Sequence, residues 1–182
     1  MNTETELKYL VNKLPLNYDR KLEIVQIYFN PKGKKKIIKK IFEGIDLDTI
    51  TTFRVRKIVE NKEVKFVITL KTKSLDGYSR EEYEKEITKE VYDSLIEKSI
   101  DSMILKNRYI IDKDNYNFEF DEYLNLSINL LTVEVELSSS INDDIIKEKE
   151  KIENILSNEF NLDILDVSKD SKYKNSNLHK YF

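Results

Sequence analysis

Apolar and polar residues alternate along several stretches of the chain, with a period of two residues. In TETELKYLV, near the N-terminus, the charged residues Glu4, Glu6 and Lys8 alternate with Leu7 and Tyr9. Successive side chains of a β-strand point to opposite faces, so this stretch is expected to form a strand with its three charges on one face. In all, we expect strands near residues 3–11, 22–29, 50–59, 63–73, 78–87, 103–112, 116–124 and 131–138.

One stretch between the strands has a helical period. TKEVYDSLIEKS begins with Thr88, a residue type that caps helix N-termini, and its Val91, Leu95 and Ile96 share one face. A second helix is predicted in SINDDIIKEKEKIENILSNEF, near the C-terminus. There Ser140 is followed by the acid of a capping box, and the apolar stripe consists of Ile145, Ile146, Ile152 and Leu156.

The lysine-rich segment KGKKKIIKKIFE, at residues 32–43, predicts either a short amphipathic helix or an extension of a strand. Lysine is abundant throughout the chain and alanine is absent, which we attribute to codon bias. We therefore interpret the segment as a solvated surface loop rather than a nucleic-acid site. Many strands, two further helices and short connections indicate an antiparallel α+β fold.

Composition narrows the class of protein. The 182-residue chain is 40% apolar and 36% charged, with a net charge of -3 and no cysteine. We expect one soluble, cytoplasmic domain over residues 1–182, without disulfides, thiolate catalysis or cysteine-bound zinc. Because the sequence has no apolar N-terminal leader and no apolar run as long as a membrane span, no membrane partner is expected.

The charged faces of the predicted strands are sorted by sign. A half-exposed strand also has one charged face, so solvent exposure explains any single strand. Like charges at i and i+2 repel, however, and sorted groups favour strands that close into a barrel with the charges inside, where bases bind a polyanion and acids bind hard cations. The groups are Arg54 and Arg56; Lys71 and Lys73; Arg80 with Glu82 and Glu84; Lys106 and Arg108; Glu119 and Asp121; Glu134 and Glu136.

A series of short motifs follows a fixed order along the chain. ETELK at residues 4–8 has the form ExExK, and SREEYE at residues 79–84 contains RxExE. The other motifs are QIYF at 26–29, RVR at 54–56, TLK at 69–71, KNRY at 106–109, EFD at 119–121, VEVEL at 133–137 and DVSKDSKYKNSNL near the C-terminus. In this order they resemble the CYTH superfamily, the triphosphate tunnel metalloenzymes, over nearly the whole chain, with an apparent insertion around residues 31–48.

The resemblance implies an eight-stranded antiparallel β-barrel, a triphosphate tunnel with a charged lumen and amphipathic helices packed outside. It implies that Mg²⁺ or Mn²⁺ is the cofactor, which agrees with a donor set of carboxylates without His or Cys. Glu82, Glu84, Glu119 and Lys73 are expected to support the site, although Glu82 and Glu84 are equally explained as an acid–base ladder between strands. The implied substrate-binding residues are Arg54, Arg56, Lys71, Arg80, Lys106 and Arg108, and the implied metal ligands are Glu4, Glu6, Asp121, Glu134 and Glu136.

Within the superfamily, the chain is most similar to the bacterial inorganic tripolyphosphatases. That branch implies hydrolysis of tripolyphosphate to pyrophosphate and phosphate, with Lys8 and Tyr28 helping to activate the attacking water. The protonation state of Lys8 stays open, because nearby cations lower its pKa and nearby acids raise it. Class IV adenylate cyclase is an alternative, although the segment LNLSINLLTVEVEL has no glycine where cyclases usually carry a glycine turn.

Two non-enzymatic interpretations also remain. The fold is compatible with a non-catalytic module that binds polyphosphate or a nucleotide, and with a β-sheet scaffold that binds no ligand. The expected partner is a small anionic substrate, tripolyphosphate or a nucleoside triphosphate, and not a nucleic acid. A homodimer is left open. His179, the only histidine, lies near the C-terminus and is expected to have no catalytic role.

Overall fold

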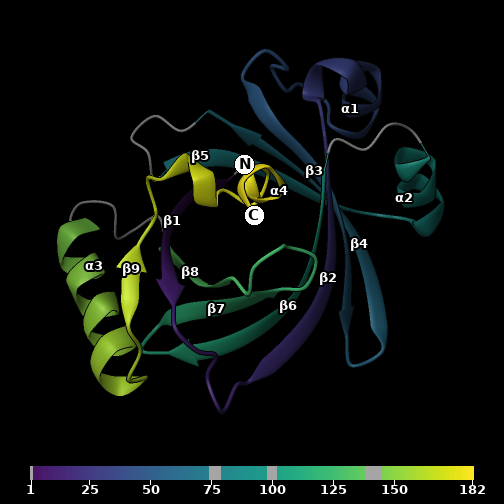
Figure 1. The fold of residues 1–182 in the computed structure, drawn as a ribbon. Helices are drawn as coiled ribbons and strands as arrows, with labels where there is room; N and C mark the ends of the chain where they lie inside the picture. The colour runs from purple at the N-terminus through teal and green to yellow at the C-terminus, as the bar shows by residue number, and fades with distance from the viewer. Residues whose placement is uncertain (1, 74–78, 98–101, 138–144) are drawn as a thin grey trace.

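The chain forms an α+β structure with an antiparallel sheet (Figure 1). The computed structural model describes residues 2–73, 79–97, 102–137 and 145–182. The α-helices in the described part are α1 (Lys35–Ile41), α2 (Lys89–Ile96), α3 (Ile145–Asn154) and α4 (Leu178–Tyr181). The strands are β1 (Asn2–Val11), β2 (Arg20–Phe29), β3 (Ile50–Glu60), β4 (Glu63–Thr72), β5 (Ser79–Ile87), β6 (Ser102–Lys113), β7 (Tyr116–Tyr123), β8 (Leu131–Leu137) and β9 (Ile164–Asp166).

The eight predicted strands are confirmed, each within two residues of its expected bounds. The short strand β9 was not predicted. The predicted helix after Thr88 is confirmed as α2, and the Thr88 side chain accepts a hydrogen bond from the backbone N–H of Val91. The proposed capping box of Ser140 and Asp143 lies outside the described residues, so it stays a prediction.

The strands form a nine-stranded antiparallel sheet in the order β5-β4-β3-β2-β6-β7-β8-β1-β9, and β1 pairs in addition with β5. One edge of β1 pairs with β8. The other edge pairs with β5 over residues 2–5 and with β9 over residues 9–11. On that edge, residues 6–8 pair with neither β5 nor β9 in the described chain, because they lie between the two pairings.

Two hairpins fix the register of neighbouring strands. Asn61 and Lys62 join β3 to β4, and Asp114 and Asn115 join β6 to β7, all four with positive φ. Two-residue turns with positive φ at both positions match the twist of antiparallel strands, and Asn and Asp adopt this conformation more readily than most residues. The turns thereby hold the charged faces of the paired strands on the same side of the sheet.

The apolar faces of β1, β7 and β8 are covered by α3 and the turn that follows it. Leu7, Tyr9 and Phe120 are fully buried there against Ile152 and Leu156. The predicted apolar stripe of this helix is thus confirmed at its C-terminal end. Ile146 was placed wrongly in that stripe, because its side chain is 72% exposed.

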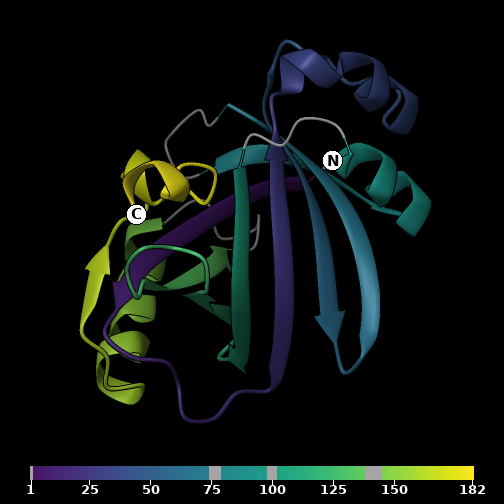
Figure 2. The same ribbon diagram turned by 45° about the vertical axis from the view of Figure 1, so that its right-hand side comes forward.

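A second apolar cluster lies over the outer faces of β2, β3 and β4, under α1 and α2. Phe53 and Leu70 from the strands pack there with Ile38 of α1 and Leu95 of α2. The lysine-rich segment thus forms a 3₁₀ turn followed by a helix, rather than a strand extension. Figure 2 shows α3 on one side of the strands and α1 with α2 on the other. None of the described helices is both long and apolar enough to cross a membrane.

A third cluster joins the inner face of the sheet to the C-terminal segment. Leu178 of α4 is fully buried against Ile104, Tyr123 and Leu130. This segment lies across one side of the space that the strands enclose (Figure 1). The apolar contacts therefore fix the tail against the face of the strands that carries the charges.

Candidate functional site

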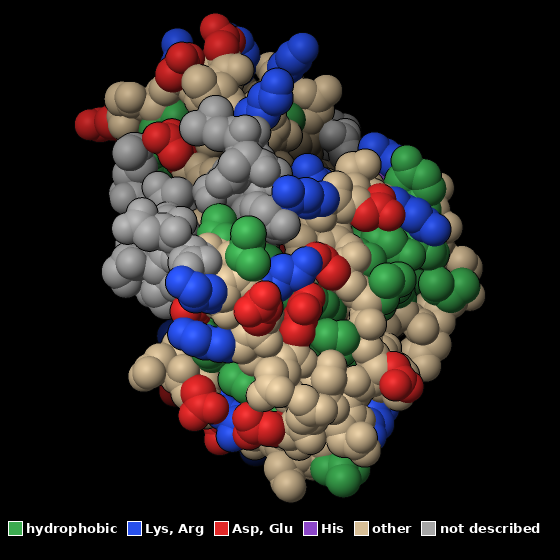
Figure 3. Space-filling model, turned by 90° about the vertical axis from the view of Figure 1, so that its left-hand side faces the viewer, with side chains coloured by type: hydrophobic (Ala, Val, Ile, Leu, Met, Phe, Trp, Pro, Cys, Tyr) green, Lys and Arg blue, Asp and Glu red, His purple; other side chains and the backbone are tan. Residues whose placement is uncertain are grey.

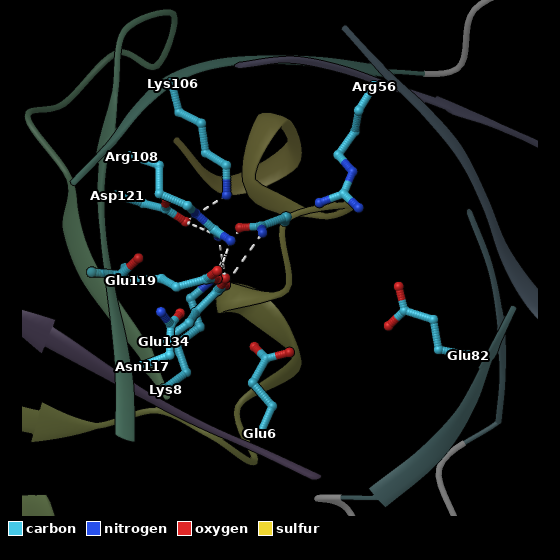
Figure 4. Close-up of polar contacts among 12 residues, drawn as sticks. Glu6, Lys8, Arg56, Glu82, Lys106, Arg108, Asn117, Glu119, Asp121 and Glu134 are labelled. Atoms are coloured by element: carbon cyan, nitrogen blue, oxygen red, sulfur yellow. Dashed lines mark hydrogen bonds and ion pairs between the residues drawn. The ribbon is translucent and has the colours of Figure 1, made fainter. Parts of the chain in front are cut away.

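The charged faces of the strands surround a cavity of about 1160 Å³. Figure 4 shows Arg56 and Glu82 on the wall opposite Lys106 and Arg108, with Glu6 between the two walls. Residues 41–45, at the end of α1 and directly after it, also line the cavity. The sequence-predicted residues that line it are Glu6, Lys8, Tyr28, Arg54, Arg56, Lys71, Lys73, Arg80, Glu82, Glu84, Arg108, Glu119, Glu134 and Glu136.

One wall is a network of buried ion pairs centred on Glu134. Its Oε1 lies 2.9 Å from Lys8 Nζ, and its Oε2 lies 2.6 Å from Arg108 Nη2. Burial opposes ionisation of this carboxyl group, but Lys8, Lys106 and Arg108 together hold its pKa well below the usual value. Glu134 is therefore an anion in the folded protein, and the cations of this wall are balanced by it.

Lys8 is held as a cation by the same network. Burial lowers its pKa, but Glu134, the Tyr123 hydroxyl and Glu6 raise it more, so that its pKa lies above the ordinary value. Lys8 carries its proton at neutral pH.

Among the predicted site residues whose side chains are described, two do not line the cavity. Lys106 and Asp121 are 2% and 0% exposed, and their charged atoms lie 2.5 Å apart behind Arg108. Burial and the neighbouring Arg108 lower the pKa of Lys106 to about 8, although Asp121 and Glu134 act in the opposite direction. In this arrangement Asp121 holds two cations of the wall in place and does not face the space available to a metal ion.

The opposite wall carries a second group of bases, each paired with an acid. Glu82 lies 3.4 Å from Arg54 Nη2 and 2.9 Å from Lys71 Nζ. Glu84 lies 2.5 Å from Arg56 Nη2. Burial and Arg54 lower the pKa of Arg56 to about 10. These bases project into the cavity, and the two glutamates hold them there.

Acidic side chains meet where β1 and β8 are paired. Glu6 and Glu136 are direct cross-strand partners and both line the cavity. Arg80 Nη2 lies 3.4 Å from Glu6 Oε2. The side chain of Glu4 lies outside the described part of the chain, although its backbone pairs with Arg80. Among the described residues, no group of three or more His, Cys, Asp or Glu side chains is placed to hold a metal ion.

Tyr28 faces the cavity from β2, next to Arg54 on β3. Its hydroxyl accepts a hydrogen bond from the Gln26 amide. Burial raises the pKa of the Tyr28 hydroxyl, and the nearby cations Arg54 and Lys8 only partly offset this. Tyr28 is therefore a neutral phenol at neutral pH, able to donate a hydrogen bond into the cavity.

Sequence reasoning missed three residues that contact Lys8. Tyr123 is the next residue after Glu119 and Asp121 on the same face of β7, so the alternation along this strand could have predicted that it faces inward. Ser168 and Asn175 belong to the C-terminal segment, which carries a family motif from which no role was predicted for either residue. Their side chains reach Lys8 from residues more than 150 positions away.

The outer surface differs from the cavity in its charge pattern. Figure 3 shows basic and acidic side chains mixed over the face that carries α3 and β9. Lys149 and Lys151 of α3, for example, pair with Glu153 and Glu148. This face of the surface therefore favours no ligand of one sign.

Solved structures with a similar fold include one protein for which a triphosphatase activity is described. The PH1819 protein of Pyrococcus horikoshii matches with a TM-score of 0.63 and 21% identity, over 89% of this chain and 93% of that chain. HpAC1 of Hippeastrum, proposed as an adenylyl cyclase and found to have a dominant triphosphatase activity, matches with a TM-score of 0.61 and 14% identity, over 97% and 95%. The chain has the fold of CYTH-like proteins.

The CYTH-like fold does not by itself assign a function. A chain of the Schizosaccharomyces pombe Mediator head module also matches, with a TM-score of 0.57 and 12% identity, over 90% of this chain and 100% of that chain. No protein-family model matches the sequence, and no curated protein matches it. Function must therefore be argued from the cavity.

Proposed function

We propose that this protein hydrolyses a linear triphosphate, with inorganic tripolyphosphate as substrate, in a metal-dependent reaction inside a closed barrel. The observation that carries the proposal is the cavity itself. Six of the sequence-predicted bases that line it lie on β1, β3, β4, β5 and β6, which suits an extended polyanion better than a single phosphate. They are Lys8, Arg54, Arg56, Lys71, Arg80 and Arg108.

The pairing of β1 with both β8 and β5 supports closure of the eight long strands into a barrel. Closure matters for the chemistry, because charged groups in a site screened from bulk water act on a ligand more strongly than on a surface. Arginine is suited to this role, since its planar fork binds phosphate oxygens at two points. Arg54 and Arg56 would grip the substrate from one wall and Arg108 from the other.

The carboxylates fit a hard divalent cation. Glu6 and Glu136 are adjacent across β1 and β8, face the cavity, and offer only oxygen ligands, as Mg²⁺ and Mn²⁺ prefer. We assign them, with Glu4, as the residues that would hold the ion. Mg²⁺ or Mn²⁺ bound there would neutralise charge on the phosphoryl oxygens. The contacts of Asp121 favour a supporting role for that residue.

The proposed step is attack of water on a terminal phosphorus. One P–O bond forms to the water oxygen and the bridging P–O bond breaks, so that pyrophosphate is the leaving group; one water proton stays on the new phosphate, and the other passes to the pyrophosphate oxygen or to solvent. Lys8, as a cation, stabilises the negative charge that develops on the phosphoryl oxygens, and Tyr28 donates a hydrogen bond. A cationic Lys8 and a neutral Tyr28, both lining the cavity, are compatible with these roles, which differ from that of a general base.

The experiment is to measure phosphate and pyrophosphate release from tripolyphosphate, ATP and thiamine triphosphate, each with Mg²⁺, with Mn²⁺ and with EDTA. Metal-dependent cleavage of tripolyphosphate is the expected result. Pyrophosphate release from ATP together with cyclic AMP would instead identify an adenylate cyclase, the activity for which HpAC1 was proposed. Tight tripolyphosphate binding without any turnover would identify a binding module.

A further inference from the structure

The C-terminal segment contacts every backbone polar group of Lys8. The backbone N–H of Lys8 donates to Ser168 Oγ at 3.0 Å. Its backbone C=O accepts from the N–H of Val167 at 2.9 Å and from Ser168 Oγ at 3.3 Å. These contacts occur where β1 has left its ladder with β5 and has not yet joined the ladder with β9. The segment thus takes the place of a neighbouring strand at Lys8.

The same segment also contacts the Lys8 ammonium group. Nζ donates to Asn175 Oδ1 at 2.9 Å, to Glu134 Oε1 at 2.9 Å and to Tyr123 OH at 3.3 Å. An ammonium group has three N–H donors, so these three acceptors satisfy it completely. The direction in which Nζ points is therefore set jointly by β8, β7 and the tail.

An amide is the side chain that suits position 175. Its Oδ1 accepts from Lys8 and also from the Tyr123 hydroxyl, at 2.6 Å. Its Nδ2 donates to Glu134 Oε1 at 3.3 Å. A carboxylate in the same place would lose the donor and would stand beside Glu134, a like charge. A hydrocarbon would leave the ammonium group and the phenol each without one partner.

We infer that Asn175 is a positioning residue, which holds the Lys8 ammonium group at the cavity wall, where its positive charge acts on the phosphoryl oxygens of the substrate. The inference rests on the proposed function and deepens it. The C-terminal segment is then part of the site, with Val167 and Ser168 fixing the backbone of Lys8 and Asn175 fixing its charge. Asn175 acts through Lys8 and does no chemistry of its own.

The test compares Asn175→Ala and Asn175→Leu with Asn177→Ala. Asn177 is a matched control, because it lies two residues further along the tail and its side chain bonds to Ser171 rather than to Lys8. For tripolyphosphate, kcat of both Asn175 variants should fall by about 10- to 100-fold, as for other residues that orient a reacting group, while KM changes little. Asn177→Ala should keep the wild-type kcat.

A second readout does not depend on turnover. Lys8 reactivity is measured by reductive methylation followed by peptide mass spectrometry, and Lys8 should be modified faster in both Asn175 variants than in the wild type or Asn177→Ala. If an Asn175 variant does not fold, Ser168→Ala, which removes a contact to the Lys8 backbone, replaces it in both assays.

The outcomes separate the two proposals. A wild-type protein that cleaves no triphosphate would overturn the proposed function, while the methylation rates would still decide whether Asn175 holds Lys8. An active wild type whose kcat and Lys8 methylation are both unchanged by Asn175→Ala would overturn the positioning role alone. Loss of kcat without a change in Lys8 methylation would also count against it, because Asn175 would then act elsewhere.

Discussion

Arg108 on β6 and Asp121 on β7 are cross-strand partners that form a two-point ion pair. Nε lies 2.7 Å from Oδ1, and Nη2 lies 2.7 Å from Oδ2. Asp121 is fully buried, and it also accepts a hydrogen bond from Lys106. Asp121 thus pairs with two buried cations, Arg108 in the cavity wall and Lys106 behind it.

Asp121→Ala should destabilise the fold by about 3–5 kcal/mol, because it leaves Lys106 and Arg108 buried with less compensation. The free energy of unfolding is measured by urea denaturation in EDTA, so that metal binding does not contribute. Asp48→Ala removes an exposed ion pair with Lys35 and serves as the control, with a much smaller change. Equal effects of the two substitutions would contradict the proposed structural role of Asp121.

The pKa of Lys106 predicts a pH dependence of stability. Its pKa is about 8 in the folded protein, below the ordinary value of 10.5. Between these two pH values the unfolded chain binds more protons, so the free energy of unfolding rises with pH, by at most about 1.4 kcal/mol per pH unit. The full cost of burying the charged form is present below pH 8, and it falls to zero as the pH rises from 8 to 10.5.

Lys106→Met should remove this contribution and leave Asp121 paired with Arg108. The difference in unfolding free energy between wild type and variant, measured by urea denaturation from pH 7 to pH 10.5, should shift in favour of the wild type above pH 8. A difference that stays constant over this range would mean that the folded-state pKa of Lys106 is not lowered.

Glu82→Gln should strengthen tripolyphosphate binding in the absence of metal. Glu82 forms ion pairs with both Arg54 and Lys71, so the substrate must compete with Glu82 for the N–H donors of these two bases. The loss of one competing charge should tighten binding by about tenfold, equivalent to 1.4 kcal/mol. Calorimetric titration in EDTA measures the affinity.

Glu81→Gln is the control for this substitution, because it changes the net charge equally on the opposite face of β5, where Glu81 contacts Tyr83. If the two variants gain equal affinity, the effect comes from net charge and not from release of the bases. If Glu82→Gln binds more weakly than wild type, Glu82 orients the bases more than it occupies them.

Glu136→Gln should weaken Mn²⁺ binding by about 10- to 100-fold, because the amide lacks the charge that a hard cation requires. Free Mn²⁺ is measured by its electron paramagnetic resonance signal during titration of the protein. Glu150→Gln changes an exposed acid of α3 and should bind Mn²⁺ as the wild type does. Unchanged Mn²⁺ binding by Glu136→Gln would remove Glu136 from the proposed ligands.

Much of the fold and many cavity residues could be predicted from sequence, because both depend on the alternation of apolar and charged residues along the strands, with a period of two residues. Successive residues of a strand point to opposite faces. Arg54, Arg56 and Glu134 could therefore be predicted to face inward without knowledge of the strand order. The strands are long, and their polar faces carry charges rather than neutral residues, which makes the alternation easy to detect.

The remaining features depend on long-range packing. Strand β9 has three residues, too few for a period to be recognised. Asn175 and Lys8 are separated by 167 positions, and no local pattern brings the tail to β1. Asp121 lies on the same face of its strand as the cavity residue Glu119, yet the side chains of Arg108 and Lys106 cover it. Burial behind a neighbouring side chain depends on packing and not on the position of the residue in the strand alternation.

Alternate residues of the strands have different roles, because one face packs in the apolar layer and the other lines the cavity. Outward side chains such as Val133 and Val135 pack under α3, whereas Glu134 between them faces the cavity. Substitutions on one face can therefore accumulate without altering the other. A saturation mutagenesis survey along β8 should show abundance and turnover responding at alternate positions. Evolution of a new ligand preference would then require changes at every second residue only, with the supporting layer of helices left intact.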